Sequence, residues 1–418
     1  MKFYIDPGTG SMLFTILIGI LGALRYVFKS WFVKLRFFLS GGRKTKDDGD
    51  KLPFVIFSEG KQYWNIFNPV CRELEERGIE AVYMTASEED PALKNEYKHI
   101  KTEFIGTGNK AFAKLNFLNA DIVLATTPGL DVYQWKRSRE VKSYVHMFHA
   151  AGDVTLYRMF GVDYYDALLI SGDYQEKQIR DLEGLRNLPA KEIVKVGIPY
   201  MDEMLRRFKN NPNVNQKNDK TTILLAPSWG PSAILSKYGK KIIDVLLETG
   251  YHVIVRPHPQ SFTSEKELME SLMKEYPNSE QLEWNRDADN FEVLKRSDIL
   301  ISDFSGVIFD FALVYDKPVI YADTSFDDSV YDAWWLDSKL WTFEILPYLG
   351  MQLNADNMGK LKEMIDQCIN EEKYAEGRKK AITDTWAYQG EGAKRVVDFI
   401  VMKQKELEEK QMLEGAND

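Results

Sequence analysis

The stretch DILISDFSGVIFDFALVYDKPVIYAD, residues 298–323, decides the fold class. Its first apolar segment ends in the polar turn SDFSG, and the apolar helical run VIFDFALVY and a second apolar segment, PVIYAD, follow that turn. Strand, turn, helix and strand in this order predict two neighbouring parallel strands with a helix packed across them. We therefore predict an α/β fold whose sheets are mainly parallel and covered on both faces.

Similar strand and helix signals lie before and after this stretch, in two series. The polar break KNNPNVNQKNDK, 209–220, separates the series, and ILLAPSW and YHVIVRPHP restart the alternation after it. We expect two doubly wound, Rossmann-like domains, 51–208 and 221–353, followed by charged helices at 354–418. The first series contains one clear helix, 63–77, ended by Gly78, and candidate strands at 54–57, 81–84, 121–125, 143–148, 167–170 and 193–196.

The composition fits two globular domains in a reducing compartment. The chain has 418 residues, of which 44% are hydrophobic, enough for two cores at about 150 residues per domain. Its two cysteines, Cys71 and Cys368, form no CxxC or Cys/His cluster, so we expect neither a disulfide framework nor a zinc site. Residues 1–46 hold eight Lys/Arg against one Asp, so the net charge of −9 leaves −16 for the rest. An acidic body argues against a nucleic-acid partner.

The basic excess follows an apolar segment near the N-terminus. That segment, MLFTILIGILGALRYVF at 12–28, lies at the short end of the roughly 17 to 25 residues that span a bilayer. Basic residues after the segment, rather than before it, favour a retained anchor over a cleaved signal peptide and hold the rest of the chain in the cytoplasm. We expect an N-terminal membrane helix within residues 1–50 and attachment to the cytoplasmic face of the cell membrane. An interfacial or re-entrant helix is the alternative to a span.

The SDFSG turn is the strongest candidate site, because ligands of doubly wound sheets bind where strands end and helices begin. The free N–H groups at the start of the following helix and the hydroxyl of Ser305 suit a phosphate. Alternatively, Asp303 or Ser305 only caps the helix, which requires the same residue types.

A second cluster, RPHP at 256–259, follows the apolar strand segment YHVIV. Arg256 offers several donors in a geometry that suits phosphate, and His258 offers a donor or a proton shuttle. The two prolines stiffen the turn that carries both side chains. A plain structural turn is the alternative.

The third cluster is YVHMFHAAGD, 144–153. Side chains alternate along a strand, so His146 and His149 face opposite sides of the sheet, which argues against a metal-binding pair. His149 ends the strand beside small residues that let a ligand approach, and we take it as the functional candidate. We expect His146 to belong to the core.

Two weaker signals also follow strands. SEGK, 58–61, places Lys61 where an acceptor substrate could bind, and APSWG, 226–230, places Ser228 and Trp229 where a donor nucleotide could bind. Either segment could equally be an ordinary turn.

Taken in order, HAAGD, GIPYMD at 197–202, ILLAPSW, RPHP and the segment 302–323 resemble the signature of the CDP-glycerol glycerophosphotransferase family, which includes teichoic acid polymerases and primases. The similarity covers roughly residues 53–400. The resemblance implies a GT-B-like fold, with a cleft between two Rossmann-like domains. The family usually has His-Gly-Thr-Pro where this chain has HAAGD, and a second serine where this chain has Gly306.

The resemblance also implies residue roles. It makes His149 the base and places His258 and Arg256 at the donor pyrophosphate, with Ser302, Asp303, Ser305 and Gly306 around the donor phosphates. It implies transfer of glycerol phosphate from CDP-glycerol, or a related CDP-alditol, to a hydroxyl of a lipid-linked polymer at the membrane, without cofactor or metal. We expect His149 to titrate near working pH. Two alternatives remain: a GT-B enzyme that uses a nucleotide sugar, and an inactive membrane-tethered binding protein, which the HAAGD departure motivates.

Overall fold

The structure is a computed structural model that describes residues 51–211, 220–287, 289–323 and 327–415. The residues from Lys51 onward belong to one compact unit. The predicted membrane helix and its basic flank, residues 1–50, and most of the predicted linker, residues 212–219, lie outside the described residues. None of the helices within the described ranges is long and apolar enough to span a bilayer.

Seven parallel strands form the first sheet, in the order β3-β2-β1-β4-β5-β6-β7. All six predicted strands are present, and β3 is an additional strand at the sheet edge. Its sequence, IKTEF, is only partly buried and lacks the apolar run that marks the others. The strands are β1 (Leu52–Ser58), β2 (Ala81–Thr85), β3 (Ile100–Phe104), β4 (Ala120–Ala125), β5 (Val141–Met147), β6 (Ala167–Ile170) and β7 (Glu192–Lys195).

Both faces of the first sheet are buried, as expected for parallel strands. Phe54 and Ile56 of β1 belong to one core and Val55 and Phe57 to the other, which follows the two-residue period of a strand. The helices α2 (Trp64–Glu76) and α16 (Gly392–Gly415) cover the first face, and α3 (Asn109–Leu115) and α4 (Asp173–Arg186) contribute to the second. Gly78 follows α2 with a positive φ of 65°, in agreement with the predicted helix end.

Six parallel strands form the second sheet, in the order β10-β9-β8-β11-β12-β13. The four central strands are at the predicted positions, whereas the two edge strands were not predicted, because their sequences, LEW and GMQL, contain polar residues or glycine instead of a continuous apolar run. The strands are β8 (Thr222–Leu225), β9 (His252–Val255), β10 (Leu282–Trp284), β11 (Ile299–Ser302), β12 (Val319–Ala322) and β13 (Gly350–Leu353).

Helices also cover both faces of the second sheet. One core contains α7 (Lys240–Glu248), α9 (Lys266–Glu275) and α14 (Leu361–Asn370). The opposite core contains α5 (Pro199–Lys209), α10 (Phe291–Arg296), α11 (Val307–Phe309), the π-helix η4 (Asp310–Val314), α13 (Leu346–Leu349) and α15 (Glu372–Thr385). Three short helices lie between these elements, namely α6 (Ile234–Tyr238), α8 (Ser261–Ser264) and α12 (Trp341–Glu344).

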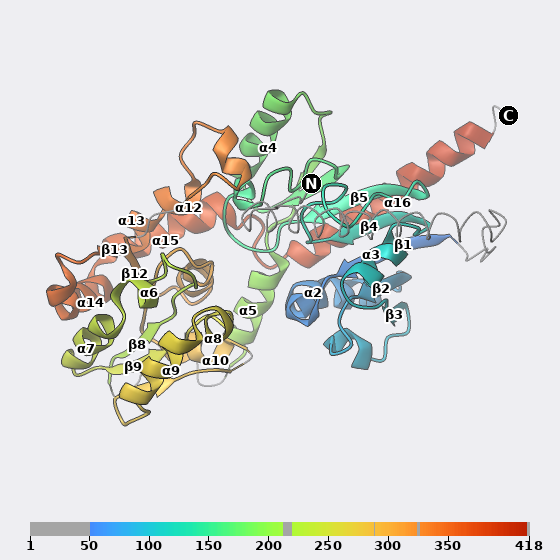
Figure 1. Cartoon of the computed structure of the whole chain (residues 1–418). Helices are drawn as coiled ribbons and strands as arrows, with labels where there is room; N and C mark the ends of the chain where they lie inside the picture. The colour runs from blue at the N-terminus through green and yellow to red at the C-terminus, as the bar shows by residue number, and fades with distance from the viewer. Residues whose placement is uncertain (1–50, 212–219, 288, 324–326, 416–418) are drawn as a thin grey trace, which may run out of the picture. The chain divides into compact units, whose positions relative to one another are not determined.

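The helices after residue 354 divide between the two sheets. In Figure 1, α14 lies with the second sheet, whereas α16, in red, lies beside the blue and green elements of the first. The carboxylate of Asp202 holds the crossing between α15 and α16, because it accepts hydrogen bonds from Trp386 Nε1 (2.9 Å) and from the backbone N–H groups of Gly390 (2.7 Å) and Gly392 (2.9 Å). Gly197 lets this segment approach closely, since a Cβ there would lie 2.2 Å from Ala387 O. The GIPYMD motif therefore fixes the crossing.

Two buried carboxylates tie the segment 327–344 to the first sheet's loops. Asp153, the last residue of HAAGD, accepts hydrogen bonds from the backbone N–H groups of Trp341 (2.9 Å) and Thr342 (2.7 Å) at the start of α12. Asp332 accepts hydrogen bonds from the N–H groups of Phe160 (2.7 Å) and Gly161 (3.2 Å). These hydrogen bonds hold the segment 327–344, which precedes β13 of the second sheet, against the loops of the first sheet.

Candidate active site

Polar side chains from both sheets line a cleft with a volume of about 410 Å³. They come from segments that follow the carboxyl ends of the strands, where parallel sheets place their ligands. From the first sheet come Gln62, Asn65, Ile66, His149 and Ala150, which follow β1 and β5. From the second come Ala226, Pro227, the RPHP turn, Asp289, Asn290, Ser305, Gly306, Val307 and Asp310, and Tyr200 of α5 also contributes.

His149 lies in the cleft wall just beyond the end of β5. Its ring and that of Tyr63 pack in a T-shaped arrangement, with 5.8 Å between the ring centroids and an interplanar angle of 82°. Its Nδ1 is buried and has no hydrogen-bond partner among the described residues. Burial lowers the pKa of His149 to about 4, so the expected titration near working pH is wrong. The imidazole is neutral at neutral pH and can accept a proton.

His146 belongs to the core, as predicted. Its side chain is fully buried, and its Nε2 lies 3.2 Å from the hydroxyl of Tyr157. The rings of Phe148, Tyr157 and Tyr165 surround it, with centroids 4.7 to 5.4 Å away. Burial lowers the pKa of His146 to about 3. No group of three or more potential metal ligands occurs within the described ranges.

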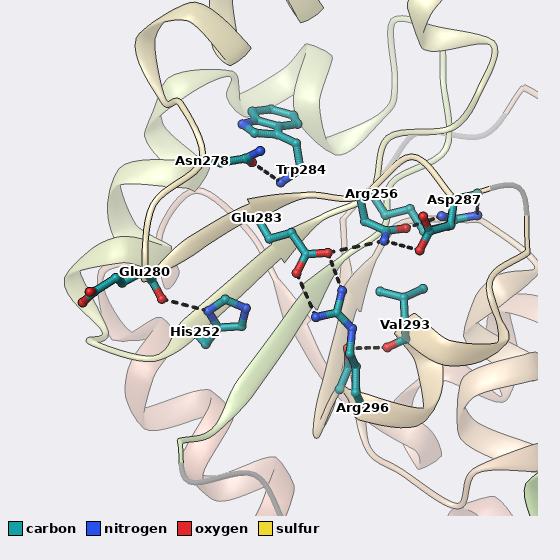
Figure 2. A network of polar contacts seen from close by, with 11 residues as sticks. His252, Arg256, Asn278, Glu280, Glu283, Trp284, Asp287, Val293 and Arg296 are labelled. Carbon is teal, nitrogen blue, oxygen red and sulfur yellow. Dashed lines mark hydrogen bonds and ion pairs between the residues drawn. The ribbon is translucent and has the colours of Figure 1, made fainter. Parts of the chain in front are cut away.

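Arg256 follows β9, and its guanidinium is positioned by the loop after β10. One nitrogen donates to Asn285 Oδ1, and the other donates to the backbone oxygen of Asp287 at 2.8 Å. Figure 2 shows this arrangement and the neighbouring pair between Arg296 and Glu283. A guanidinium has five N–H donors, so donors remain for a phosphate in the cleft.

His258 follows Arg256 by two residues and is exposed to the cleft. The backbone N–H of Gln260 donates to its Nδ1 at 3.1 Å. The neutral ring therefore carries its proton on Nε2, which can donate to an anionic oxygen. Trp229 lies close by, with 6.4 Å between the two ring centroids, and is 47% exposed. An exposed indole beside a phosphate-binding group suits the base of a nucleotide.

Ser305 and Gly306 line the cleft at the start of α11, as the SDFSG motif predicts. A Cβ added to Gly306 would have no atom within 4 Å, so this position opens into free space. The helix changes to a π-helix at Asp310, only three residues after it begins. Such π-turns are rare and are frequently found at functional sites.

Ser302 and Asp303 are buried instead of lining the cleft, which corrects their predicted role in phosphate binding. Ser302 ends β11, and its hydroxyl donates to the backbone oxygen of Ala226 at 2.6 Å. The carboxylate of Asp303 accepts hydrogen bonds from the N–H groups of Ser228 (2.9 Å) and Ile234 (3.0 Å). Both side chains hold the turn after β8 against the end of β11, and so position the cleft residues indirectly.

Lys61 also lies outside the cleft lining, contrary to its predicted contact with the acceptor. It is in the short helix η1 (Lys61–Tyr63), and its ammonium forms an ion pair with Glu89. The adjacent Gln62 lines the cleft in its place. Ser228 is buried, and its hydroxyl has no hydrogen-bond partner among the described residues.

Two further residues of the same cleft wall, Asp310 and Tyr200, were not predicted from the sequence. Burial raises the pKa of the Asp310 carboxyl to about 7. Burial and the nearby Asp310 raise the pKa of Tyr200 above its usual range. No described residue donates a hydrogen bond to the Asp310 carboxyl, which is therefore free to accept one from a ligand hydroxyl. A single carboxylate inside the apolar run VIFDFALVY was the available signal, because lone buried carboxylates are rare.

The site therefore combines a neutral imidazole on one wall with an arginine, a histidine and helix-start N–H groups on the other. The second wall suits a phosphate or pyrophosphate, since charged donors and free N–H groups stabilise anionic oxygens. The first wall suits a hydroxyl that loses its proton to the imidazole. Together they fit transfer of a phosphorus-linked group to a hydroxyl.

Comparison with known sequences agrees with this chemistry. Residues 132–402 match the family described as CDP-Glycerol:Poly(glycerophosphate) glycerophosphotransferase. A teichoic acid glycerol-phosphate primase from Bacillus spizizenii is 26% identical over 171 residues, which cover 38% of this chain. The aligned region spans 40% of the primase's own length.

Solved structures share the fold. The wall teichoic acid polymerase TagF aligns with a TM-score of 0.55 at 16% identity, over 87% of this chain and 91% of the polymerase chain. The UDP-GlcNAc 2-epimerase from Methanocaldococcus jannaschii aligns with a TM-score of 0.54 at 15% identity, over 84% and 99% of the two chains. These likenesses confirm the predicted GT-B-like arrangement of two parallel-sheet α/β halves.

Proposed function

Because this chain belongs to the CDP-glycerol:poly(glycerophosphate) glycerophosphotransferase family, we propose that it transfers glycerol phosphate from CDP-glycerol to an acceptor hydroxyl in teichoic acid or related cell-surface polymer synthesis. One observation carries the proposal: the cleft places His149 on the wall that faces Arg256, His258 and Ser305. The donor pyrophosphate binds on the second-sheet wall and the acceptor hydroxyl on the first-sheet wall.

In the reaction, the acceptor oxygen attacks the phosphorus that carries glycerol. A new O–P bond forms while the bond from that phosphorus to the bridging pyrophosphate oxygen breaks, and CMP leaves. His149 accepts the proton of the hydroxyl. The bound donor is anionic, so it stabilises the imidazolium and raises the pKa of His149 above the value of about 4 that burial alone gives.

The leaving CMP gains negative charge as the bond breaks. Arg256 and the Nε2–H of His258 stabilise that charge, together with the N–H groups at the start of α11. Asp310 and Tyr200 lie beside this site, where they form hydrogen bonds with the hydroxyl groups of the bound CDP-glycerol. Positioning and charge stabilisation supply most of the rate enhancement in such reactions.

Nucleotide release identifies the donor. Purified protein is incubated over membranes with labelled CDP-glycerol, CDP-ribitol and UDP-sugars, and CMP or UDP is measured. Release of CMP with labelled product supports the proposal. Turnover of UDP-sugars alone would assign the cleft to a nucleotide sugar, the chemistry of the epimerase that shares the fold. Binding without any product would indicate a binding protein.

We expect Arg256→Ala and Ser305→Ala each to weaken CDP-glycerol binding by roughly 10- to 100-fold, because each removes a hydrogen bond to a charged group. Calorimetry measures the affinity, and thermal melting verifies folding. Ser279→Ala is the matched control, because Ser279 lies in the turn before β10 and does not line the cleft. Unchanged affinity in both cleft variants would reassign Arg256 and Ser305 to turn and cap roles.

We also propose that the chain acts at the cytoplasmic face of the cell membrane on a lipid-linked acceptor. The support is the apolar segment 12–28 with the basic residues that follow it. Attachment raises the effective concentration of an acceptor that is confined to the same surface.

We expect the full chain to sediment with membranes, and a truncated chain that starts at Lys51 to stay in the supernatant while folded. The truncation removes the apolar segment and its basic flank but keeps every described strand and helix. Fractionation at low and high salt separates apolar insertion from surface charge attraction. A full chain that is soluble under both conditions contradicts attachment.

A further inference from the structure

The indole of Trp341 stacks on an aromatic ring from each half of the chain. Trp341 begins α12, and its ring stacks on Tyr174 of α4 with 4.7 Å between the ring centroids and an interplanar angle of 19°. It also stacks on Phe309 of α11, at 5.3 Å and 30°. Trp341 is half-buried and is not among the residues that line the cleft. The stack therefore joins a helix of the first sheet to the helix that follows the SDFSG turn.

Tyr174 is bonded to the loop that carries His149. The hydroxyl of Tyr174 donates a hydrogen bond to the backbone oxygen of Gly152 at 2.7 Å, and the N–H of Gly152 donates to that hydroxyl at 3.1 Å. The next residue, Asp153, accepts hydrogen bonds from the first two backbone N–H groups of α12. Both attachments lie within four residues of His149, so the position of its imidazole depends on where α12 and the indole lie.

Phe309 provides a fixed face for the indole on the side of the donor. It is 3% exposed and belongs to the core that covers one face of the second sheet. Its backbone N–H donates to the oxygen of Gly306 at 3.0 Å, and Gly306 and Ser305 line the cleft at the start of this helix. Because packed interiors transmit displacements, the seat of the indole on Phe309 relates the loop of His149 to the phosphate-binding helix start.

Resting on the proposed function, we infer that Trp341 is a positioning residue, which sets the separation between His149 and the donor phosphates through Tyr174 and Phe309. Reacting atoms must lie about 3 to 3.5 Å apart, and a displacement of about 1 Å can slow a reaction 100-fold. The residues that bind the donor phosphates come from the second sheet, whose core holds Phe309 without the indole. Loss of the stack therefore slows transfer without weakening the binding of CDP-glycerol.

The first test removes the stack and then restores a ring. In the full chain, assayed with labelled CDP-glycerol over membranes, Trp341→Ala is expected to lower kcat by about 10- to 100-fold and to change the KM for CDP-glycerol by less than about twofold. Trp341→Phe keeps an aromatic ring in the stack and loses the hydrogen bond from Nε1 to Asp384 at 3.2 Å, so most of kcat should return. A purely structural residue would lower the melting temperature and leave kcat per folded molecule unchanged, which would overturn the inference.

The second test breaks the link to the loop and keeps the stack. Tyr174→Phe retains the ring against Trp341 but removes the hydroxyl that binds Gly152, and kcat should fall by about tenfold. Tyr144→Phe is the matched control, because that buried hydroxyl accepts a hydrogen bond from the N–H of Ser138 at 2.8 Å and does not line the cleft. It should affect stability alone. A wild-type kcat in Tyr174→Phe contradicts positioning through the stack.

The third test combines Trp341→Ala with His149→Ala. If the indole acts by placing the imidazole, the second substitution has little left to remove, and the double variant should transfer within about threefold of the rate of His149→Ala. Effects that multiply, or a KM for CDP-glycerol that rises in Trp341→Ala, overturn the inference and leave the proposed function intact. Absence of transfer by the unmodified chain overturns the proposed function, and the inference with it.

Discussion

His149→Ala is expected to reduce glycerol phosphate transfer by about 100- to 10,000-fold, the range for loss of a positioned general base. The neutral imidazole lies at the cleft wall opposite the phosphate-binding residues, and its removal leaves the acceptor hydroxyl without a proton acceptor there. Affinity for CDP-glycerol should change little, since the donor groups come from the second sheet. Transfer of labelled glycerol phosphate and calorimetry of donor binding measure the two effects separately.

His146→Ala is the control for this prediction. His146 packs among aromatic rings in the core and does not line the cleft, so its removal should lower the melting temperature and leave turnover per folded molecule close to normal. Near-normal transfer by a folded His149→Ala protein would remove the base mechanism. It would leave the nucleotide-sugar and binding-protein alternatives open.

Asp332→Ala is expected to lower the free energy of unfolding by about 3 to 5 kcal/mol, the cost of breaking a buried charge pair. The side chains of Asp332 and Arg186 are 1% and 6% exposed, and they form an ion pair. The substitution leaves the N–H groups of Phe160 and Gly161 without their acceptor and leaves Asp163, at 2.8 Å, as the remaining partner of Arg186. Denaturant unfolding measures the change.

Lys177→Ala is the matched control. Lys177 pairs with Asp181 one turn away on the surface of α4, with its side chain 71% exposed, and such exposed pairs contribute less than about 1 kcal/mol. If Asp332→Ala costs no more than Lys177→Ala, the link between the segment 327–344 and the first sheet's loops does not contribute to stability.

The sequence predicts the central strands of both sheets because they are apolar on both faces. Residues 54–57 and 299–302 are short runs that a parallel sheet buries completely. The edge strands β3, β10 and β13 were missed because one side of an edge strand meets solvent or loops, so their apolar signal is weak. The return of α16 to the first sheet was also missed, since a helical period says which face is buried but not which sheet buries it.

The same reasoning explains which site residues were predicted. His149, Arg256, His258, Ser305 and Gly306 follow strand ends and do line the cleft. Ser302 and Asp303 belong to the same motif as Ser305 but are buried, because their side chains form hydrogen bonds with backbone groups of the turn after β8.

Asp310 could not be placed from sequence for a different reason. The π-turn that begins at Asp310 changes the direction of the helix's side chains, and a regular 3.6-residue period does not reveal it. Lys61 and Gln62 are neighbours, and only their contacts decide which one lines the cleft.

The return of α16 to the first sheet also has a consequence for biosynthesis. Val396, Val397, Phe399 and Ile400 of α16 complete the core that covers one face of that sheet. The ribosome makes the first sheet before the second and makes α16 after both, so the part of this apolar face that α16 covers, beside α2, stays open throughout translation of the second half. The first half therefore cannot complete its core as soon as it emerges, as an N-terminal domain usually does, and completes it only after α16 has left the exit tunnel.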